Sequence, residues 1–513
     1  MSDLVHSEPT VGSFIFRSLR RYPDRTAFSW NGRTMSYAAA LELIGRLQAV
    51  FSARGLGRGN TIAMLAGNRA EAWCAKVAAQ ASGIGVTDLH PFGAAPDQAY
   101  QVADSAADAL IVDCPRFAER AAELIGRFER ERHVFSLGPS DFGVDLLAAA
   151  ESAGAAGPVD VASGEDVSTL KYTGGTTGRP KGVLRRHASA LRASLVLLSD
   201  FEFPNEPRYL ATAPISHVTG TNIEPTLALG GTVHLLDGFD PDAVLATIAR
   251  ERINTALFVP TMIYALLDHP DLDRTDLSSL ELLLYGASSM SPSLLSEGIE
   301  RLGPVFAQLY GQTECYPISY LRKSDHADSS LIGSCGMPVG NCEVTVRGDD
   351  GNEVPAGEPG EICVRGPVVM ERYVNQPDVT AEALQGDWLH TGDIAYRDDR
   401  GYLHIVDRKK DMIVSGGFNV FPREVEDALT GHDAVSVAAV YGVADDKWGE
   451  AVTATVVLRP GHEVTPDELI RHVKSVKGSV QAPKQIRVVE ELPRTPVGKI
   501  DKKALRAQWG PRS

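Results

Sequence analysis

Strand-like apolar runs alternate with helix-like segments along most of this chain, and one stretch shows the alternation clearly. Residues 282–285 have the apolar character of a buried strand, the Ser-Pro pair at 291–292 is typical of a helix start, and the next strand is expected at 305–310. This succession predicts two parallel strands covered by their crossover helix. Strand-to-helix transitions are also expected at 232–241 and 253–260, so the sequence indicates an α/β fold.

The chain has 513 residues, more than one hydrophobic core usually accommodates. A run of alternating charge occurs at 407–411, and the pattern of expected elements changes after it. Short strands and two or three helices follow, with helices expected at 422–430 and 466–473. We therefore predict two domains. The first, at 1–409, is a large N-terminal domain of helix-covered, mostly parallel sheets, and the second, at 410–513, is a small α+β C-terminal lid domain.

The composition restricts the class of partner and compartment. A formal net charge of −16 argues against nucleic acid, but a local cationic site can still bind ATP, because salt screens exposed charges beyond about 10 Å. No apolar run approaches the roughly 18 residues of a membrane span, and residues 1–8 lack a signal-peptide pattern. We expect a cytoplasmic protein. The six cysteines form no C-x-x-C pair, so neither a zinc site nor a disulfide framework is indicated.

The strongest chemical signal is a loop, Thr173-Gly-Gly-Thr-Thr-Gly-Arg-Pro-Lys-Gly182, which follows an Ala-, Gly- and Ser-rich segment at 148–166 that we expect to be a mobile connection. Glycines let backbone N–H groups turn inward around an anion, and the threonines and the lysine add donors and charge. The loop is not a Walker A motif, which needs G-K-[ST]. The expected phosphate-binding residues are Thr173, Gly174, Gly175, Thr176, Thr177, Gly178 and Lys181, of which Thr176 is also a possible metal ligand.

The string from Tyr172 to Gly182 resembles the phosphate loop of the adenylate-forming superfamily, which includes acyl-CoA ligases, the adenylation domains of peptide synthetases and beetle luciferases. Most members have serine where this chain has Gly174, and the glycine form is similar to that of some bacterial fatty acyl-CoA ligases. The resemblance extends over about 170–500. It implies a large ATP-binding domain, a mobile lid, and Mg²⁺ and ATP as the groups bound at the loop.

A second signature, Tyr310-Gly-Gln-Thr-Glu314, follows the strand expected at 305–310. Ligands of parallel sheets bind at the carboxyl ends of the strands, where Glu314 could ligate Mg²⁺ and Thr313 could donate to a phosphate. The resemblance implies that Tyr310 lies near adenine, that Thr313 meets the α-phosphate and that Glu314 holds the magnesium ion. Further nucleotide-binding positions expected around this strand pair are Gly311, Gln312, Gly286, Ala287 and Ser288.

Three more residues complete the expected adenylation site. Asp393, in a Thr-Gly-Asp turn, can accept hydrogen bonds from both ribose hydroxyls, and Arg408 offers a planar fork of donors. By the resemblance, Asp393 binds the ribose, and Arg408 binds the ribose or a phosphate. Lys499 matches a P-x-T-x-x-G-K signature and, by the same resemblance, reaches the carboxylate and the α-phosphate. Such a preorganised contact contributes about 10²–10³ in rate.

Two further stretches concern the acid and the thiol. His217, in Pro214-Ile-Ser-His, resembles a gate beside the acyl-phosphate, although a satisfied core histidine explains it equally well. Gly416 and Gly417 match a loop that borders the thiol tunnel for coenzyme A, and Lys410 corresponds to the hinge of the lid.

Together these features predict an ATP-dependent acyl-CoA ligase that activates a hydrophobic carboxylic acid through an acyl-adenylate and transfers it to the CoA thiol. An amino-acid adenylating enzyme is disfavoured because no carboxylate occurs between Ile215 and Ile223. An acyl-adenylate former that loads a carrier protein stays open. A nucleotide-binding regulator is disfavoured by the joint presence of the adenylation residues. The acid and the oligomeric state are left open, with Phe258, Met262 and Ile318 as possible apolar lining of the acid pocket.

Overall fold

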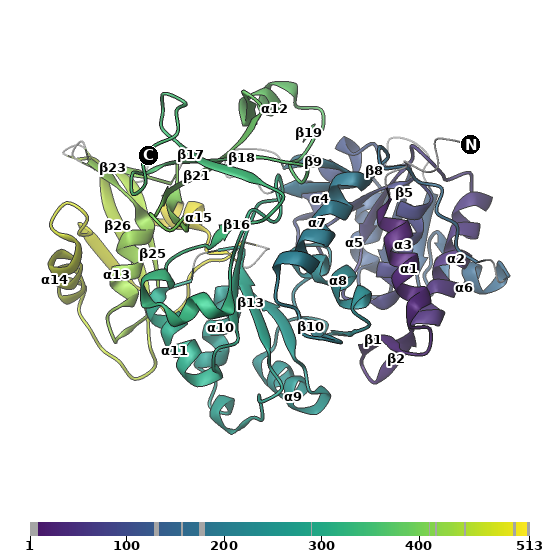
Figure 1. Ribbon diagram of the computed structural model, residues 1–513, viewed down its shortest axis with the longest axis horizontal. Coiled ribbons are helices and arrows are strands. Elements are labelled where there is room, and N and C mark those ends of the chain that lie inside the picture. The colour runs from purple at the N-terminus through teal and green to yellow at the C-terminus, as the bar shows by residue number, and fades with distance from the viewer. Residues whose placement is uncertain are drawn as a thin grey trace.

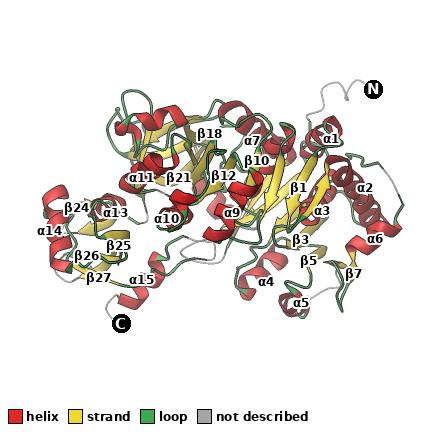
Figure 2. Ribbon diagram, turned by 90° about the horizontal axis from the view of Figure 1, so that it is seen from below, coloured by secondary structure: helices red, strands yellow, loops and turns green. Residues whose placement is uncertain are grey.

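The computed structural model describes residues 9–127, 133–154, 157–173, 180–288, 290–409, 411–415, 418–445, 448–495 and 499–509. Within these residues the strands form four sheets. In Figure 1 the yellow-green C-terminal elements lie at one end of the molecule and the purple N-terminal helices at the other. Figure 2 shows helices packed around the sheets of the larger part and the smaller part set off at one end. The α/β fold class with a small C-terminal domain is confirmed.

The largest sheet contains the predicted strand-helix-strand unit. Parallel pairing joins β13 to β14 through Leu283–Phe306 and Gly286–Leu309, and α11 connects them. All five residues of each strand are buried, as expected for parallel strands covered on both faces. In sheet order the described strands are β16 (Met337–Pro338), β15 (Ser319–Leu321), β14 (Phe306–Tyr310), β13 (Leu282–Gly286), β12 (Thr255–Phe258), β10 (Arg208–Ala211), β11 (Thr232–Leu235), β1 (Thr26–Trp30) and β2 (Arg33–Ser36).

The second sheet carries the hairpin that flanks the Gly/Thr loop. Strands β8 and β9 pair antiparallel, with Thr173 opposite Lys181, and β19 pairs antiparallel with β9 at the end of the sheet, whereas β8 and the strands from β4 to β7 pair parallel. In order its strands are β19 (Arg372–Tyr373), β9 (Lys181–Arg186), β8 (Val167–Thr173), β4 (Gly85–Asp88), β3 (Thr61–Leu65), β5 (Ala109–Asp113), β6 (His133–Leu137) and β7 (Val144–Asp145).

The two remaining sheets lie later in the chain. The third comprises β17 (Glu343–Arg347), β18 (Gly360–Arg365), β21 (Trp388–Arg397), β20 (Leu384–Gln385) and β22 (Leu403–Arg408). The fourth belongs to the small domain and comprises β24 (Phe418–Val420), β23 (Ile413–Ser415), β26 (Gly449–Leu458), β25 (Val435–Asp445) and β27 (Gln485–Val488).

Helices cover these sheets, and several begin with proline, whose fixed φ suits a first helical turn. The predicted starts at 241, 260, 292, 422 and 466 are all observed. None of the described helices combines the length and apolarity that a membrane crossing needs. The helices are α1 (Val11–Arg21), α2 (Tyr37–Ala53), α3 (Ala70–Ala81), α4 (Ala95–Asp104), α5 (Ala118–Ile125), α6 (Leu146–Ser152), α7 (His187–Asp200), α8 (Ile223–Ala228), α9 (Pro241–Glu251), α10 (Pro260–Leu267), α11 (Pro292–Leu302), α12 (Pro377–Ala383), α13 (Pro422–Thr430), α14 (Pro466–Lys477) and α15 (Lys502–Trp509).

One local expectation was wrong, and a second was confirmed in position but not in its side-chain contact. The segment at 148–166 is not simply a connection, because α6 runs to Ser152 and the backbone N–H of Val161 donates to the Ala81 carbonyl. Ser291 occupies the N-cap of α11 but its side chain makes no capping bond. Instead its hydroxyl lies 2.8 Å from the Thr430 hydroxyl of the small domain, so this serine contributes to domain contact rather than to the helix end.

Candidate active site

The β8–β9 hairpin presents Lys181 beside the rest of the site. Its ammonium lies 5.0 Å from the centroid of the Tyr373 ring, and Tyr373 belongs to β19, which pairs with β9. The loop residues Gly174, Gly175, Thr176, Thr177 and Gly178 lie outside the described residues. The hairpin itself is held tightly, because Gly182 leaves room for the Tyr172 ring, whose Cζ would be 2.9 Å from a Cβ at that position.

Glu314 is connected to this hairpin through Tyr373. The Tyr373 hydroxyl donates to Glu314 Oε1 at 2.8 Å, and burial, followed by the charge of Glu314, raises the pKa of Tyr373. The carboxylate keeps its second oxygen for another ligand. Mg²⁺ prefers hard oxygen ligands such as a carboxylate, so the residues present are compatible with a magnesium ion at Glu314.

Tyr310 and Gln312 hold a buried carboxylate. The Tyr310 hydroxyl donates to Asp393 Oδ2 at 2.7 Å, and Gln312 Nε2 donates to the same oxygen at 2.6 Å. Asp393 is only 4% exposed. A buried charge is tolerated when it is paired and hydrogen-bonded, so these contacts fix the carboxylate in one position.

Arg408 completes the surroundings of that carboxylate. Asp393 and Arg408 face each other across β21 and β22, and Arg408 Nε lies 3.1 Å from Asp393 Oδ1. The negative charge of Asp393 raises the pKa of Arg408. The guanidinium is nearly half exposed, so it can bind a second acceptor on its open side.

Arg185 links the hairpin sheet to the Tyr310–Glu314 loop. It lies on β9 and its Nη2 donates to the Thr313 carbonyl at 3.0 Å.

The end of β13 comes close to β14. Gly286 of β13 stands opposite Leu309 of β14, and a Cβ on Gly286 would collide with the Leu309 carbonyl oxygen. The glycine is therefore required by strand packing, and Ala287 after it adopts a positive φ of 65°. Ser288 follows in the same bend, and Gly311 follows β14 directly.

His217 is held in a different way from the nucleotide-side residues. Its Nδ1 is hydrogen-bonded to the Ser216 hydroxyl at 2.8 Å, and its ring packs edge-on against His90 with 4.4 Å between centroids. Burial, with smaller contributions from His90, Lys171 and Lys76, places the pKa of His217 well below its usual value. The imidazole is thus neutral at physiological pH.

Lys499 of the small domain is held by two hydrogen bonds to Thr495. Its backbone N–H donates to Thr495 Oγ1 at 3.2 Å and its carbonyl accepts from the Thr495 N–H at 2.7 Å. The residue is exposed. The neighbouring Gly498 and the predicted hinge and tunnel residues Lys410, Gly416 and Gly417 lie outside the described residues.

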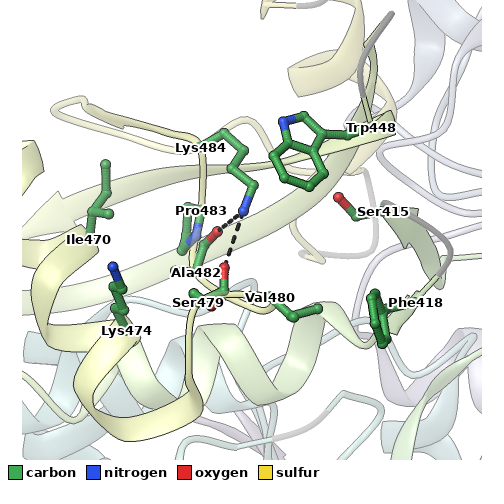
Figure 3. A pocket seen from close by; sticks show the side chains of 10 residues that line it. All are labelled: Ser415, Phe418, Trp448, Ile470, Lys474, Ser479, Val480, Ala482, Pro483 and Lys484. Carbon is green, nitrogen blue, oxygen red and sulfur yellow. Dashed lines mark hydrogen bonds between the residues drawn. The ribbon is translucent and has the colours of Figure 1, made fainter.

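A pocket of about 480 Å³ opens in the small domain next to the predicted thiol loop. Figure 3 shows Trp448 beside Lys484, with Phe418 and Lys474 on other sides of the opening. The Lys484 ammonium lies 4.8 Å from the Trp448 ring and donates to the carbonyls of Ser479 and Ala482. The pocket thus combines aromatic surface, including a Phe418 that is 59% exposed, with two ammonium groups.

The sequence reasoning missed Tyr373, Arg185, His90 and the small-domain pocket. Tyr373 stands on a two-residue strand with no pattern of its own, and its role depends entirely on pairing with β9. The proposed apolar lining does not form one surface, since Phe258 and Met262 pack in one hydrophobic cluster and Ile318 in another.

Comparison with known proteins places the chain in a family. Residues 15–374 match the model for AMP-binding enzymes, and residues 424–499 match that for the AMP-binding enzyme C-terminal domain. A medium/long-chain-fatty-acid–CoA ligase of Mycobacterium tuberculosis is 42% identical, covering 99% of this chain and 91% of the relative. A feruloyl-CoA synthase of an Amycolatopsis species is 36% identical over 98% of this chain and 99% of its own length.

A solved structure shows the same fold. The amide bond synthetase of Marinactinospora thermotolerans superimposes with a TM-score of 0.90 at 34% identity, covering 96% of this chain and 99% of the other. The similarity therefore extends over both domains.

Proposed function

This chain belongs to the AMP-binding enzyme family, and we propose that it is an ATP-dependent acyl-CoA ligase that activates a hydrophobic carboxylic acid through an acyl-adenylate. The observation that carries the proposal is the buried Asp393, held by Tyr310, Gln312 and Arg408 beside the Glu314–Tyr373–Lys181 contact. This arrangement supports a ribose acceptor at Asp393 and phosphate-directed charges at Arg408 and Lys181. Both relatives named above as CoA ligases or synthases agree with it.

In the first half-reaction the acid's carboxylate attacks the α-phosphate of ATP, which gives acyl-adenylate and pyrophosphate. Asp393 accepts hydrogen bonds from the ribose hydroxyls. Arg408 binds the ribose or a phosphate, and Thr313 binds the α-phosphate. Lys181 and the Gly/Thr loop bind the departing pyrophosphate. Lys499 neutralises charge that develops at the α-phosphate, an effect of preorganised cations that requires no covalent chemistry.

Magnesium would be held by Glu314, with Thr176 as a second ligand. When bound, the ion neutralises the charge of the phosphate oxygens. Tyr373 orients the Glu314 carboxylate through its 2.8 Å hydrogen bond, so the chain itself fixes the position of one ligand. We also retain the division into domains at 409/410 and the lid hinge at Lys410 as part of this proposal.

The small-domain pocket supports coenzyme A as the acceptor. An adenine ring can stack on Trp448 or Phe418, and Lys474 can bind a phosphate, because aromatic faces and ammonium groups are what a nucleotide requires. The predicted tunnel residues Gly416 and Gly417 lie between Ser415 and Phe418, both of which line this pocket. In the second half-reaction the thiol attacks the acyl carbon and AMP leaves.

The free thiols of all six cysteines agree with the proposed cytoplasmic location. Fractionation of the source cells tests that location. Loading of a carrier protein is the alternative acceptor, and it would use the same first half-reaction.

The test is pyrophosphate release over a panel of carboxylic acids, with and without CoA, followed by detection of acyl-CoA. We expect CoA-dependent thioester formation with at least one hydrophobic acid, and loss of pyrophosphate release in Glu314→Gln. Accumulation of acyl-adenylate with no transfer to CoA would instead favour a carrier protein. Absence of pyrophosphate release with every acid would contradict the proposal.

A further inference from the structure

Lys171 is a cation that the proposed mechanism does not use. It lies on β8, two residues before Thr173, and stands opposite Val183 on β9. Because side chains of a strand alternate between faces, Lys171 shares its face with Thr173 and not with Tyr172, whose hydroxyl donates to Asp104 on the other side. Lys171 is therefore directed into the molecule, on the face from which Arg185 contacts the Thr313 carbonyl.

Charged groups from four elements surround Lys171. Lys76 of α3 forms an ion pair with Asp88 of β4. Arg185 of β9 and Glu224 of α8 are also close enough to influence the charge of Lys171. Within the described residues, no hydrogen bond or ion pair joins Lys171 or Glu224 to another side chain, whereas Lys76 and Asp88 satisfy each other. The cluster thus contains a complete pair and two partly buried charges without a direct partner.

The same cluster extends to His217. Lys171 and Lys76 both act on the His217 ring, which packs against His90. In the turn between His217 and Glu224, two polar atoms are fully buried without a hydrogen-bond partner in the described part of the chain. These atoms are Thr219 Oγ1 and Asn222 Oδ1. A buried polar atom without a partner costs about 1–3 kcal/mol, so a ligand that formed hydrogen bonds with these two atoms would recover that cost.

The balance of charge identifies the chemistry of that ligand. The Lys76–Asp88 pair balances itself, which leaves the cations Lys171 and Arg185 against the single anion Glu224, and burial raises the pKa of Glu224, which weakens its negative charge. Burial, followed by Lys76, lowers the pKa of Lys171 to about 8, so at neutral pH most of it still carries the proton it donates. A protonated ammonium without a direct partner among the described residues favours a ligand that accepts a hydrogen bond.

We propose that Lys171 donates a hydrogen bond to an oxygen on the acyl chain of the substrate, so that the enzyme selects hydrophobic acids that carry a carbonyl or hydroxyl oxygen over their hydrocarbon analogues. This inference rests on the proposed function and on the resemblance by which His217 borders the acyl-phosphate. Lys171 is a specificity-determining residue here and takes no part in the transfer of the adenylyl group.

The test compares acids that differ only in the oxygen. Suitable pairs are cyclohexylpropanoic acid with its ring-ketone analogue, and decanoic acid with its terminal methyl-ketone analogue. We expect wild type to prefer the ketone of at least one pair in kcat/KM by about tenfold or more, since a hydrogen bond from a charged donor is worth about 10–100-fold. Lys171→Met should abolish this preference mainly by raising KM for the ketone, while kcat/KM for the hydrocarbon acid stays the same or rises.

Lys76→Gln is the matched control, because it removes a cation of the same cluster that already has its partner. It should leave the ratio between the two acids unchanged. Lys171→Gln, which retains a neutral donor of similar length, should keep part of the preference and serves if the Met variant does not fold. Equal losses for both acids, a raised KM for ATP, or no ketone preference in wild type would each overturn the inference. If none of the acids causes wild type to release pyrophosphate, the proposed function fails as well. That outcome is distinguishable from a loss of selectivity alone.

Discussion

The nucleotide side of the large domain and its contact with the small domain are built in opposite ways. Around Asp393, a buried carboxylate receives two short hydrogen bonds and an ion pair. At the domain contact, Arg459, which directly follows β26, approaches Glu297 of α11 at 3.3 Å with both side chains about a quarter exposed, and the hydroxyls of Ser291 and Thr430 lie 2.8 Å apart. Exposed ion pairs contribute about 0–1 kcal/mol, so this contact can open at little cost.

The difference indicates how one site could serve two half-reactions. Groups that bind ATP must keep their positions, and burial with several partners achieves that. A domain that presents Lys499 first and the thiol loop afterwards has to separate and dock again, and partly exposed contacts such as Arg459–Glu297 oppose that only weakly. Hinged closure of this kind needs only a few residues to change backbone angles.

The largest expected effect concerns Lys499, the residue that the small domain is proposed to contribute. Lys499→Ala should reduce acyl-adenylate formation by about 10²–10³, because one preorganised contact to the developing charge is lost. Thioester formation from supplied acyl-adenylate should change little. Pyrophosphate exchange and acyl-CoA formation, measured separately, check this. Lys503→Ala, an exposed lysine of α15, is the control, and equal losses in both half-reactions would show that Lys499 has another role.

On the fixed side, Tyr310→Phe should raise KM for ATP by about tenfold while the ring stays in place. The change removes a hydrogen bond to a buried carboxylate, and such bonds are worth about 1.5–3 kcal/mol. Tyr320→Phe provides a matched control, since its hydroxyl donates to Glu202 at 3.2 Å away from this site. Both variants should lose stability in urea unfolding, but only the first should affect ATP. An unchanged KM for ATP would separate Asp393 from nucleotide binding.

Much of the fold followed from sequence because its signals are local. Proline at the first turn placed the starts of α9, α10, α11, α13 and α14, and the buried runs at β13 and β14 indicated parallel pairing. Contacts that join distant segments gave no such signal. Ser291 has the residue type of a helix cap, yet it bonds to Thr430, 139 positions away. Tyr373 contacts Glu314 only because a two-residue strand pairs with β9.

A third prediction compares paired and unpaired charge inside the large domain. Lys171→Met should stabilise the protein at pH 7 by about 1–3 kcal/mol, because it removes a partly buried ammonium whose charged form is disfavoured. The pKa of Lys171 is lowered from 10.5 to about 8, so between these values the unfolded chain binds more protons. Wild-type stability should therefore receive a favourable contribution as pH rises from 8 to 10.5, and the Met variant should lack it.

Urea unfolding of wild type and Lys171→Met at pH 7 and pH 10 measures this difference. The gap between the two proteins should narrow at the higher pH. Lys76→Gln should destabilise instead, because it leaves Asp88 without its cation. A Met variant that is less stable than wild type at both pH values would show that Lys171 has a structural partner.

The smallest expected effect tests the domain contact itself. Arg459→Ala removes both guanidinium contacts to Glu297, at 3.3 and 3.4 Å, and the pair is partly exposed, so docking should weaken by no more than about 1 kcal/mol, or about fivefold. The ratio of adenylation to thiolation rates should shift by up to that factor, since only the docked arrangement loses a contact. Raising the salt concentration should produce a similar shift in wild type and a smaller one in the variant, because the ion pair that salt screens is already absent. Arg471→Ala, an exposed arginine of α14, should leave the ratio unchanged. If Arg459→Ala instead lowered both rates together by a hundredfold, the contact would be a permanent part of the fold, and the contrast between a fixed nucleotide site and a movable domain would not hold for this chain.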